Sequence, residues 1–138
     1  MDNSFHYLSM ANHSMFQKKL LAALKDTGLT LGQPKILDYL KDHDGAGQKE
    51  IAAGCHIEAP SLTSVLSRME EKGLIERRML NGNRRSLHVF ITHKGREYLP
   101  VMESAFAELE SRAFQGISQK DRDSFMATFA RIYENLEK

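Results

Sequence analysis

Two adjacent arginines, Arg84 and Arg85, stand in a turn-prone stretch directly after Asn81-Gly82-Asn83. They belong to residues 74–96, a segment with six basic residues and one acidic residue, whereas the whole chain of 138 residues has a net charge of +1. The segment therefore has a net charge of +5, and the rest of the chain sums to −4. A local excess of arginine and lysine in a nearly neutral chain predicts a basic patch that attracts phosphate.

A second set of residues with suitable chemistry precedes that segment. The apolar residues of 58–73 recur at helical spacing and would form one buried stripe: Leu62, Val65, Leu66 and Met69. The opposite face carries short hydroxyls, which approach phosphates and base edges closely, and one arginine, which can bind guanine or phosphate through two hydrogen bonds. The predicted DNA contacts on this helix are Pro60, Ser61, Thr63, Ser64, Ser67 and Arg68.

The elements that must position these residues follow the order of a helix-turn-helix and a hairpin. Strands are predicted at 75–79 and 87–91, so that Arg84 and Arg85 lie on the connecting loop and reach a narrow, negative minor groove. The predicted helices are residues 5–24, a segment from the capping pair Thr30 and Gln33 to Asp44-Gly45, residues 48–54, and a segment that starts at Glu58-Ala59-Pro60 and ends at Gly73.

Two more amphipathic helices are predicted towards the C-terminus, one capped by Thr92 and one by Ser118 with Asp121. Their apolar seams are Leu99, Met102, Phe106, Leu109 and Ala113, and Phe125, Phe129, Ile132 and Leu136. Together with the first helix they expose more apolar surface than a small central module covers, which predicts a partner chain. We expect residues 1–28 and 96–138 to form a helical dimerisation region and residues 29–95 to form a winged helix-turn-helix DNA-binding domain.

Three stretches closely resemble the MarR family of bacterial winged-helix regulators, in order and at the family's spacing: LTLGQPKILDYL, IEAPSLTSVLSRMEEKGLIERR and NRRSLHVFITHKG. The resemblance implies an α+β, mainly helical homodimer with interlocked terminal helices, which offers one winged helix to each half of a pseudo-palindromic operator. It implies a repressor relieved by a small ligand or by oxidation. Arg85 matches the wing-tip arginine of the family's Asp-x-Arg motif, and Arg68 matches the arginine in the second half of the recognition helix. Asn83 stands where the family usually has the aspartate, which removes a charge partner of the wing arginine.

The resemblance also implies a small-molecule site, with a phenolic or other aromatic acid as ligand, between the dimer helices and the winged domain. That region would include His6, Tyr7, Met10, His13, Phe16, Ile36, Tyr39 and Tyr98. Side chains of these types at helical spacing are more often core than pocket, so the ligand-binding residues stay unknown.

Three alternatives stay open at this point. The first is that Arg68 forms a structural ion pair with Glu71 or Glu76 instead of contacting DNA. The second is that Cys55 makes the protein a redox-responsive regulator, although a buried thiol in the turn before the fourth helix is favoured. The third is that the winged helix binds an acidic protein surface instead of DNA.

Several function classes are not indicated by the sequence. It has no phosphate-binding glycine loop, no nucleophile elbow and no recognisable pair of catalytic carboxylates, so we expect neither an enzyme nor a cofactor. His6 and His13 lie two helical turns apart, about 10 Å, which is too far to share one metal ion within a subunit. There is no secretion signal and no apolar run near the roughly 18 residues of a membrane span, and the single Cys55 fits a reducing compartment. The expected location is the cytoplasm.

Overall fold

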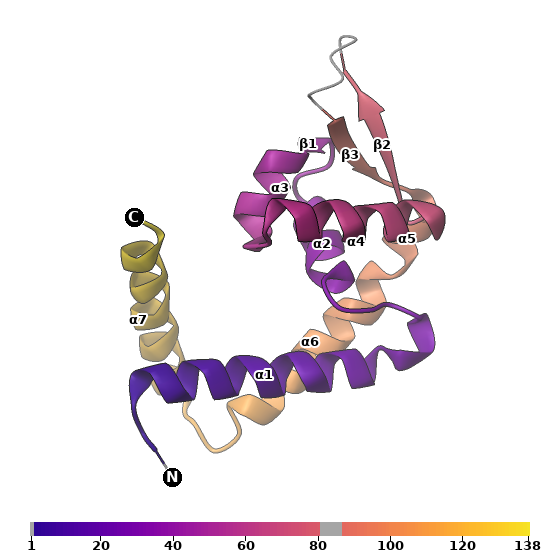
Figure 1. The fold of residues 1–138 in the computed structure, drawn as a ribbon. Helices are drawn as coiled ribbons and strands as arrows, with labels where there is room; N and C mark the ends of the chain where they lie inside the picture. The colour runs from indigo at the N-terminus through magenta and orange to yellow at the C-terminus, as the bar shows by residue number, and fades with distance from the viewer. Residues whose placement is uncertain (1, 81–86) are drawn as a thin grey trace. The chain divides into compact units, whose positions relative to one another are not determined.

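The computed structural model describes residues 2–80 and 87–138, which form two compact units, Met1–Phe106 and Ala107–Lys138. Most of the described residues are helical, and the strands form one small antiparallel sheet (Figure 1). This arrangement confirms the mainly helical winged-helix fold class. The elements are α1 (Phe5–Ala23), the 3-10 helix η1 (Lys25–Thr27), α2 (Gln33–Leu40), β1 (Ala46–Gly47), α3 (Gln48–Cys55), α4 (Ala59–Glu71), β2 (Ile75–Met79), β3 (Leu87–Ile91), α5 (His93–Glu97), α6 (Leu99–Ala113) and α7 (Gln119–Glu137).

Helix α1 begins at the N-cap Ser4, whose Oγ accepts a hydrogen bond from the backbone N–H of Tyr7. Near its C-terminal end it buries Leu20, and Leu24 follows fully buried. The rest of the helix leaves large apolar side chains in solvent, with exposed fractions of 42% to 63%: Phe5, Tyr7, Met10 and Met15. This chain therefore covers only one end of the helix that the sequence predicted.

Helix α2 begins at a different residue from the one predicted. Its N-cap is Gly32, in the left-handed conformation with φ +87°, whereas the sequence placed the cap at Thr30. The pairing of Thr30 with Gln33 is nevertheless half formed, because Gln33 Oε1 accepts from the backbone N–H of Thr30 at 3.1 Å. The same oxygen accepts from Lys72 Nζ at 3.2 Å, so the buried Gln33 amide oxygen has a tertiary partner that local spacing cannot reveal.

Helix α4 ends in the Schellman motif that the sequence predicted. Gly73 has φ +78° and donates its N–H to the carbonyl of Glu70 at 3.0 Å, and Leu74 donates to the carbonyl of Met69 at 2.9 Å. Leu74 is 1% exposed, so the residue after the cap packs back into the core. Gly73 thereby reverses the chain and sends it directly into β2.

The C-terminal end of α4 is also tied to elements before and after it in the chain. The Lys72 ammonium donates to the carbonyl of Gly28, the residue after η1, at 2.9 Å. The carbonyl of Lys72 accepts from Lys94 Nζ at 2.7 Å, and the carbonyl of Gly73 accepts from the Thr92 hydroxyl at 2.6 Å. The carbonyls at the end of a helix have no partner within it, and here Lys94 and Thr92, the N-cap of α5, supply two donors to the carbonyls just past the end of α4.

The core of the first unit lies beneath α4. The predicted stripe is buried at three of its four positions, with Val65 half-buried. The stripe packs in a core that α2 and α3 also line. The fully buried aliphatic residues of this core include Leu62, Leu66, Ile36, Leu37, Leu40 and Ile51. One face of α4 is therefore fixed against the domain, and its polar face is left outside.

The sheet is antiparallel with strand order β1-β3-β2. Strands β2 and β3 have the bounds that the sequence predicted, in a register that pairs Ile75 with Ile91, and they extend as a hairpin from beside the end of α4 (Figure 1). Strand β1 was not predicted, because two residues are too short to show alternation. Asp44 helps to hold it in place, since Asp44 Oδ1 accepts from the N–H of Ile91 at 2.8 Å.

The single helix predicted from Thr92 to Ala113 is wrong. The structure divides this segment into α5 and α6, with Tyr98 between them. Pro100 explains the break, because proline has no N–H for the helical ladder and its ring clashes with the carbonyl four residues earlier. The Thr92 cap itself is confirmed, since Thr92 Oγ1 accepts from the N–H of Gly95 at 3.0 Å.

The second unit contains the end of α6 and α7, which begins at the predicted cap, Ser118. Arg122 joins the two helices: its Nη2 lies 3.6 Å from Glu110 Oε1, and its guanidinium lies 4.3 Å above the ring of Phe114. Phe114 contacts Phe125 edge-on, with ring centroids 6.1 Å apart, and this contact extends the packing along α7.

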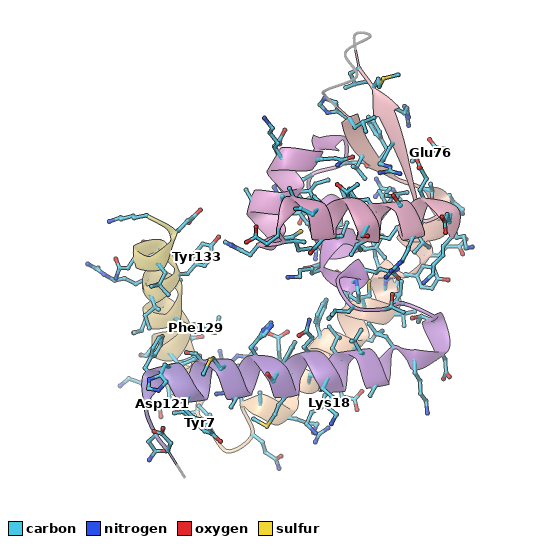
Figure 2. All side chains as sticks on the ribbon, viewed as in Figure 1. Tyr7, Lys18, Glu76, Asp121, Phe129 and Tyr133 are labelled. Atoms are coloured by element: carbon cyan, nitrogen blue, oxygen red, sulfur yellow. The ribbon has the colours of Figure 1, made fainter. Side chains whose placement is uncertain are left out.

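The predicted seam of α7 is largely exposed to solvent. Phe125 and Phe129 stack with ring centroids 5.1 Å apart, yet each is about half exposed. Tyr133 and Leu136 continue the exposed side chains along the helix, and Figure 2 shows Phe129 and Tyr133 on it. Within the second unit, Phe114 contacts the seam only at its start, at Phe125. Among the helices described, none is long and apolar enough to cross a bilayer.

The close approach of α5 to the α4–β2 turn gives a test of the fold. A Cβ on Gly95 would collide with the carbonyl oxygen of Leu74, which accepts from the N–H of Thr92 and cannot easily move. We expect Gly95→Ala to lower the free energy of unfolding by about 1–3 kcal/mol, measured by urea denaturation. The control is Gly47→Ala, where the new methyl has ordinary van der Waals space, and which we expect to change stability by less than about 1 kcal/mol. Equal effects of the two variants would contradict the packing.

Candidate nucleic-acid interface

The predicted contact face of α4 lies on the outside of the first unit. Its exposed members are Pro60, Ser61, Thr63, Ser64 and Arg68, and Ser67 is half-buried. The face is polar and free of long acidic side chains over the first ten residues of the helix, so a phosphate backbone could approach it closely. The arrangement has the form of a recognition helix.

The side chain of Arg68 has no hydrogen bond or ion pair within residues 2–80 and 87–138. The alternative that paired it with Glu71 or Glu76 is therefore not formed there. Glu76 lies instead 3.5 Å from Arg78, measured from Oε2 to Nη2, and Figure 2 shows Glu76 on β2. As far as residues 2–80 and 87–138 are concerned, the donors of the Arg68 guanidinium are available for a ligand.

An ion pair that the sequence did not predict joins α4 to β2. Arg77 Nη2 lies 3.0 Å from Glu70 Oε1, Arg77 Nε donates to the same oxygen, and the backbone N–H of Arg77 donates to Glu70 Oε2 at 2.9 Å. The hydrogen bond from that N–H is the largest cause that holds the pKa of Glu70 below its usual value near 4.5, and the Arg77 guanidinium adds to it. The two residues belong to different elements, so no periodic pattern in the sequence could have found the pair.

This ion pair and others lower the positive charge that the sequence suggested for residues 74–96. Four of the six basic residues of 74–96 lie in the described part of the chain, and each is already bonded. Arg77 pairs with Glu70, Arg78 pairs with Glu76, and Arg96 pairs with Asp44 at 3.2 Å, while Lys94 donates to a backbone carbonyl. Glu70 and Asp44 come from outside the segment, so folding brings acid to a stretch that is basic in sequence.

Of the two bonded arginines on β2, Arg78 is the more exposed. Its guanidinium lies 4.0 Å above the ring of Phe90, and its side chain is 56% exposed. The neighbouring strand residue His88 has Nδ1 at 2.8 Å from the carbonyl of Gly45, which ties the hairpin to the loop before β1. The predicted wing contacts Arg84 and Arg85, together with Asn83, lie outside the described residues.

Cys55 is 6% exposed and packs against Lys35. Its Sγ lies 3.7 Å from the carbonyl of Lys35, and Lys35 Nζ donates to the carbonyl of Cys55 at 2.9 Å. Burial raises the pKa of the Cys55 thiol, and the nearby Lys35 only partly offsets that effect. Since the thiolate is the reactive form, these contacts favour a buried thiol over an oxidant sensor.

The part of the chain that the structure describes contains no group of three or more His, Cys, Asp and Glu side chains that could hold a metal ion. A shallow cavity of about 230 Å³ in the first unit is lined by Thr27, Gly28, Leu29, Lys72, Leu74, Lys94 and Tyr98. Of the crevice residues that the resemblance implied, only Tyr98 lines this cavity, so the ligand site stays a prediction.

Comparison with known proteins agrees with this geometry. Residues 29–87 match the MarR family. The crystal structure of MarR is similar to this chain with a TM-score of 0.90 and 25% identity, over 99% of this chain and 94% of that one. A DNA complex of MepR from S. aureus is similar with a TM-score of 0.84 and 25% identity, over 98% and 99% of the two chains. The repressor CouR, bound to a 23-mer DNA duplex, is similar with a TM-score of 0.83 and 26% identity, over 94% and 92%.

The ion pair between Glu70 of α4 and Arg77 of β2 predicts that the stability of the fold depends on pH. Because the pKa of Glu70 is lower in the folded chain than its usual value near 4.5, its carboxylate stabilises the fold above that value. This contribution is lost as the pH falls through the lower, folded-state pKa. We expect Glu70→Gln to melt at a lower temperature than the wild type at pH 7, and the difference to shrink as the pH falls below about 4.5. A difference in melting temperature that stays constant from pH 7 to pH 3 would contradict the assignment.

Proposed function

We propose that this chain is a transcriptional regulator of the MarR family, whose domain matches residues 29–87, and that it binds a pseudo-palindromic DNA operator sequence-specifically as a homodimer. In this proposal α4 enters the major groove and the β2–β3 hairpin follows the neighbouring minor groove. Regulators of this family are not enzymes, and the proposed action is repression by occupancy of the operator.

The observation that carries the proposal is the outer face of α4. One side of this helix is buried, and the other side presents short hydroxyls and the uncommitted guanidinium of Arg68. Two proteins of similar structure, MepR and CouR, have been solved with DNA. Because folding pairs Arg77, Arg78 and Arg96 with acids, the charge available to phosphate comes from Arg68, Arg84 and Arg85 in this proposal.

The proposed homodimer accounts for the apolar side chains that this chain leaves exposed. They lie on helices at both ends of the sequence: Phe5, Met10 and Met15 on α1, and Phe125, Phe129 and Leu136 on α7. Exposed apolar surface of this kind marks a protein interface. A symmetric pair of chains would also present two recognition helices, as a pseudo-palindromic operator requires.

Control by a small molecule, with a phenolic or other aromatic acid as the first candidate, completes the proposal. It rests on the family resemblance, and the cavity beside Lys72, Lys94 and Tyr98 is one place to test by substitution. The proposed location is the cytoplasm, where a regulator meets its DNA. A winged-helix module for an acidic protein surface remains the second candidate, because the same exposed face would serve it.

DNA binding is tested by fluorescence anisotropy with labelled duplexes of about 30 bp, tiled across the intergenic DNA beside the chain's own gene, at low and physiological salt. We expect one duplex to bind more tightly than mixed-sequence DNA, with an affinity that falls steeply with salt. Arg85→Ala should weaken this binding by about 1–3 kcal/mol without changing the oligomeric state. The control is Arg131→Ala, which removes the same charge from an exposed position of α7 away from the apolar seam.

Two results would count against this assignment. Unchanged affinity of Arg85→Ala would remove the wing tip from the mechanism. If the wild-type chain bound neither the tiled duplexes nor mixed-sequence DNA at low salt, the DNA-binding proposal would fail, and the acidic protein surface would become the leading candidate.

The dimer is tested by placing a charge on the exposed seam of α7. We expect Phe129→Asp to convert the protein from a dimer to a monomer or to unfold it, because a carboxylate would be buried without a partner. The control is Ala127→Asp, which puts the same charge on the opposite side of the helix. Light scattering after size-exclusion chromatography gives the mass of each variant. A folded dimer of Phe129→Asp would exclude this seam from the interface.

A further inference from the structure

The hydroxyl groups of Thr63 and Ser67 lie one helical turn apart on α4, and their hydrogen bonds run in opposite directions. Thr63 Oγ1 lies 3.1 Å from the carbonyl oxygen of Ala59, which can only accept, so the threonine hydroxyl donates its proton. Ser67 Oγ lies 3.3 Å from Arg77 Nη2, and a guanidinium can only donate, so the serine oxygen accepts. The chemistry of each partner alone fixes the direction of each bond.

The two hydroxyls therefore present different groups to a ligand. The proton of Ser67 is bonded to no acceptor in residues 2–80 and 87–138 and can be donated outwards. The proton of Thr63 is held by its own helix, so Thr63 presents lone pairs. Phosphate oxygens, guanine O6 and N7, and thymine O4 are acceptors, whereas cytosine N4 and adenine N6 carry protons. Ser67 thus matches the first kind of DNA atom, and Thr63 matches the second.

Arg77 is held firmly enough to impose this state on Ser67. The backbone N–H, Nε and Nη2 of Arg77 all donate hydrogen bonds to a single carboxylate, that of Glu70. The Arg77 side chain is only 18% exposed, and Arg77 pairs in the sheet with the fully buried Val89. Ser67 and Glu70 stand three residues apart on α4, so one guanidinium spans both of them from β2.

We infer that Arg77 is a positioning residue for DNA recognition, which keeps the Ser67 hydroxyl as a donor so that Ser67 binds a hydrogen-bond acceptor on DNA. This inference rests on the proposed function, because it assigns roles within the face that meets the duplex. Arg77 itself lies behind that face, bonded to Glu70, and contacts no DNA. Its effect on affinity therefore passes through Ser67.

A double-mutant cycle in the full-length protein separates this role from a purely structural one. The variants are Arg77→Lys, which keeps the charge and loses the forked hydrogen bonds, Ser67→Ala, and the two combined. On the best of the tiled duplexes we expect Arg77→Lys to weaken binding about threefold to tenfold, and to have less than about a twofold effect in the Ser67→Ala background. The control is Thr63→Ala, in whose background Arg77→Lys should keep its full effect.

The salt dependence and the DNA sequence provide two further readouts. Because Ser67 is a neutral donor and Arg77→Lys keeps its charge, the slope of affinity against salt should not change in any of these variants. If Ser67→Ala weakens binding to mixed-sequence duplex as much as to the selected one, the acceptor is a phosphate oxygen. If the loss is confined to the selected duplex, the acceptor lies on a base edge. Both results support the donor role.

Additive effects of Arg77→Lys and Ser67→Ala would overturn the inference, and so would a salt slope reduced by about one phosphate contact in Arg77→Lys. If Arg77→Lys fails to fold, Glu70→Gln replaces it in the cycle, because this variant removes the carboxylate that holds Arg77 and leaves the charge of Arg77 unaltered. The same non-additivity with Ser67→Ala is expected. Failure of the proposed function is distinguishable, since the wild-type chain would then bind no duplex at all.

Discussion

Burial of one side of α4 is the constraint on which the rest of this molecule depends. Leu62, Leu66 and Met69 fix the rotation of the helix about its own axis, because turning it would bring apolar side chains into water and hydroxyls into the core. That rotation decides which residues can meet a ligand. The end of the helix at Gly73 then sets the direction of β2, so the hairpin is positioned relative to α4 by the same core.

Charge is the second feature that the fold rearranges. In sequence, residues 74–96 form a strongly basic segment. In the folded chain, however, Glu70 lies beside Arg77 and Asp44 lies beside Arg96, and each forms an ion pair. These arginines therefore form ion pairs that connect different elements of the fold. Arg77 also donates a hydrogen bond to the Ser67 hydroxyl, which makes the serine oxygen an acceptor. A count of charges along the chain therefore overstates the basic surface of this region.

Local signals in the sequence predicted much of this fold. The caps at Thr92 and Ser118, the Schellman motif at Gly73 and the bounds of β2 and β3 all depend on residues within a few positions of one another. The break before Pro100 had a local signal as well, although the apolar spacing across it suggested one continuous helix. By contrast, the buried amide oxygen of Gln33 accepts from Lys72, 39 positions away in sequence, and this contact could not be predicted locally.

The candidate site was predictable to the same degree. Spacing alone selected the outer face of α4, since the buried stripe leaves only one side free. It could not distinguish Arg68, which has no partner in the described residues, from Arg77, which is bonded to Glu70, because that difference depends on contacts between elements. Nor could it show that neighbouring hydroxyls on one face present opposite hydrogen-bonding groups.

The ties at the C-terminal end of α4 make that end a pivot. Lys72 reaches Gly28 at the end of η1, and Lys94 and Thr92 bind the carbonyls of Lys72 and Gly73 just past the helix, whereas the other end has no side-chain cap. From Pro60 to Lys72 the helix is a lever of about 18 Å, so a tilt of about 5° would move its first turn by about 1.5 Å. A tilt about this end would thus displace Pro60 and Ser61, in the first turn of α4, far more than it displaces Lys72.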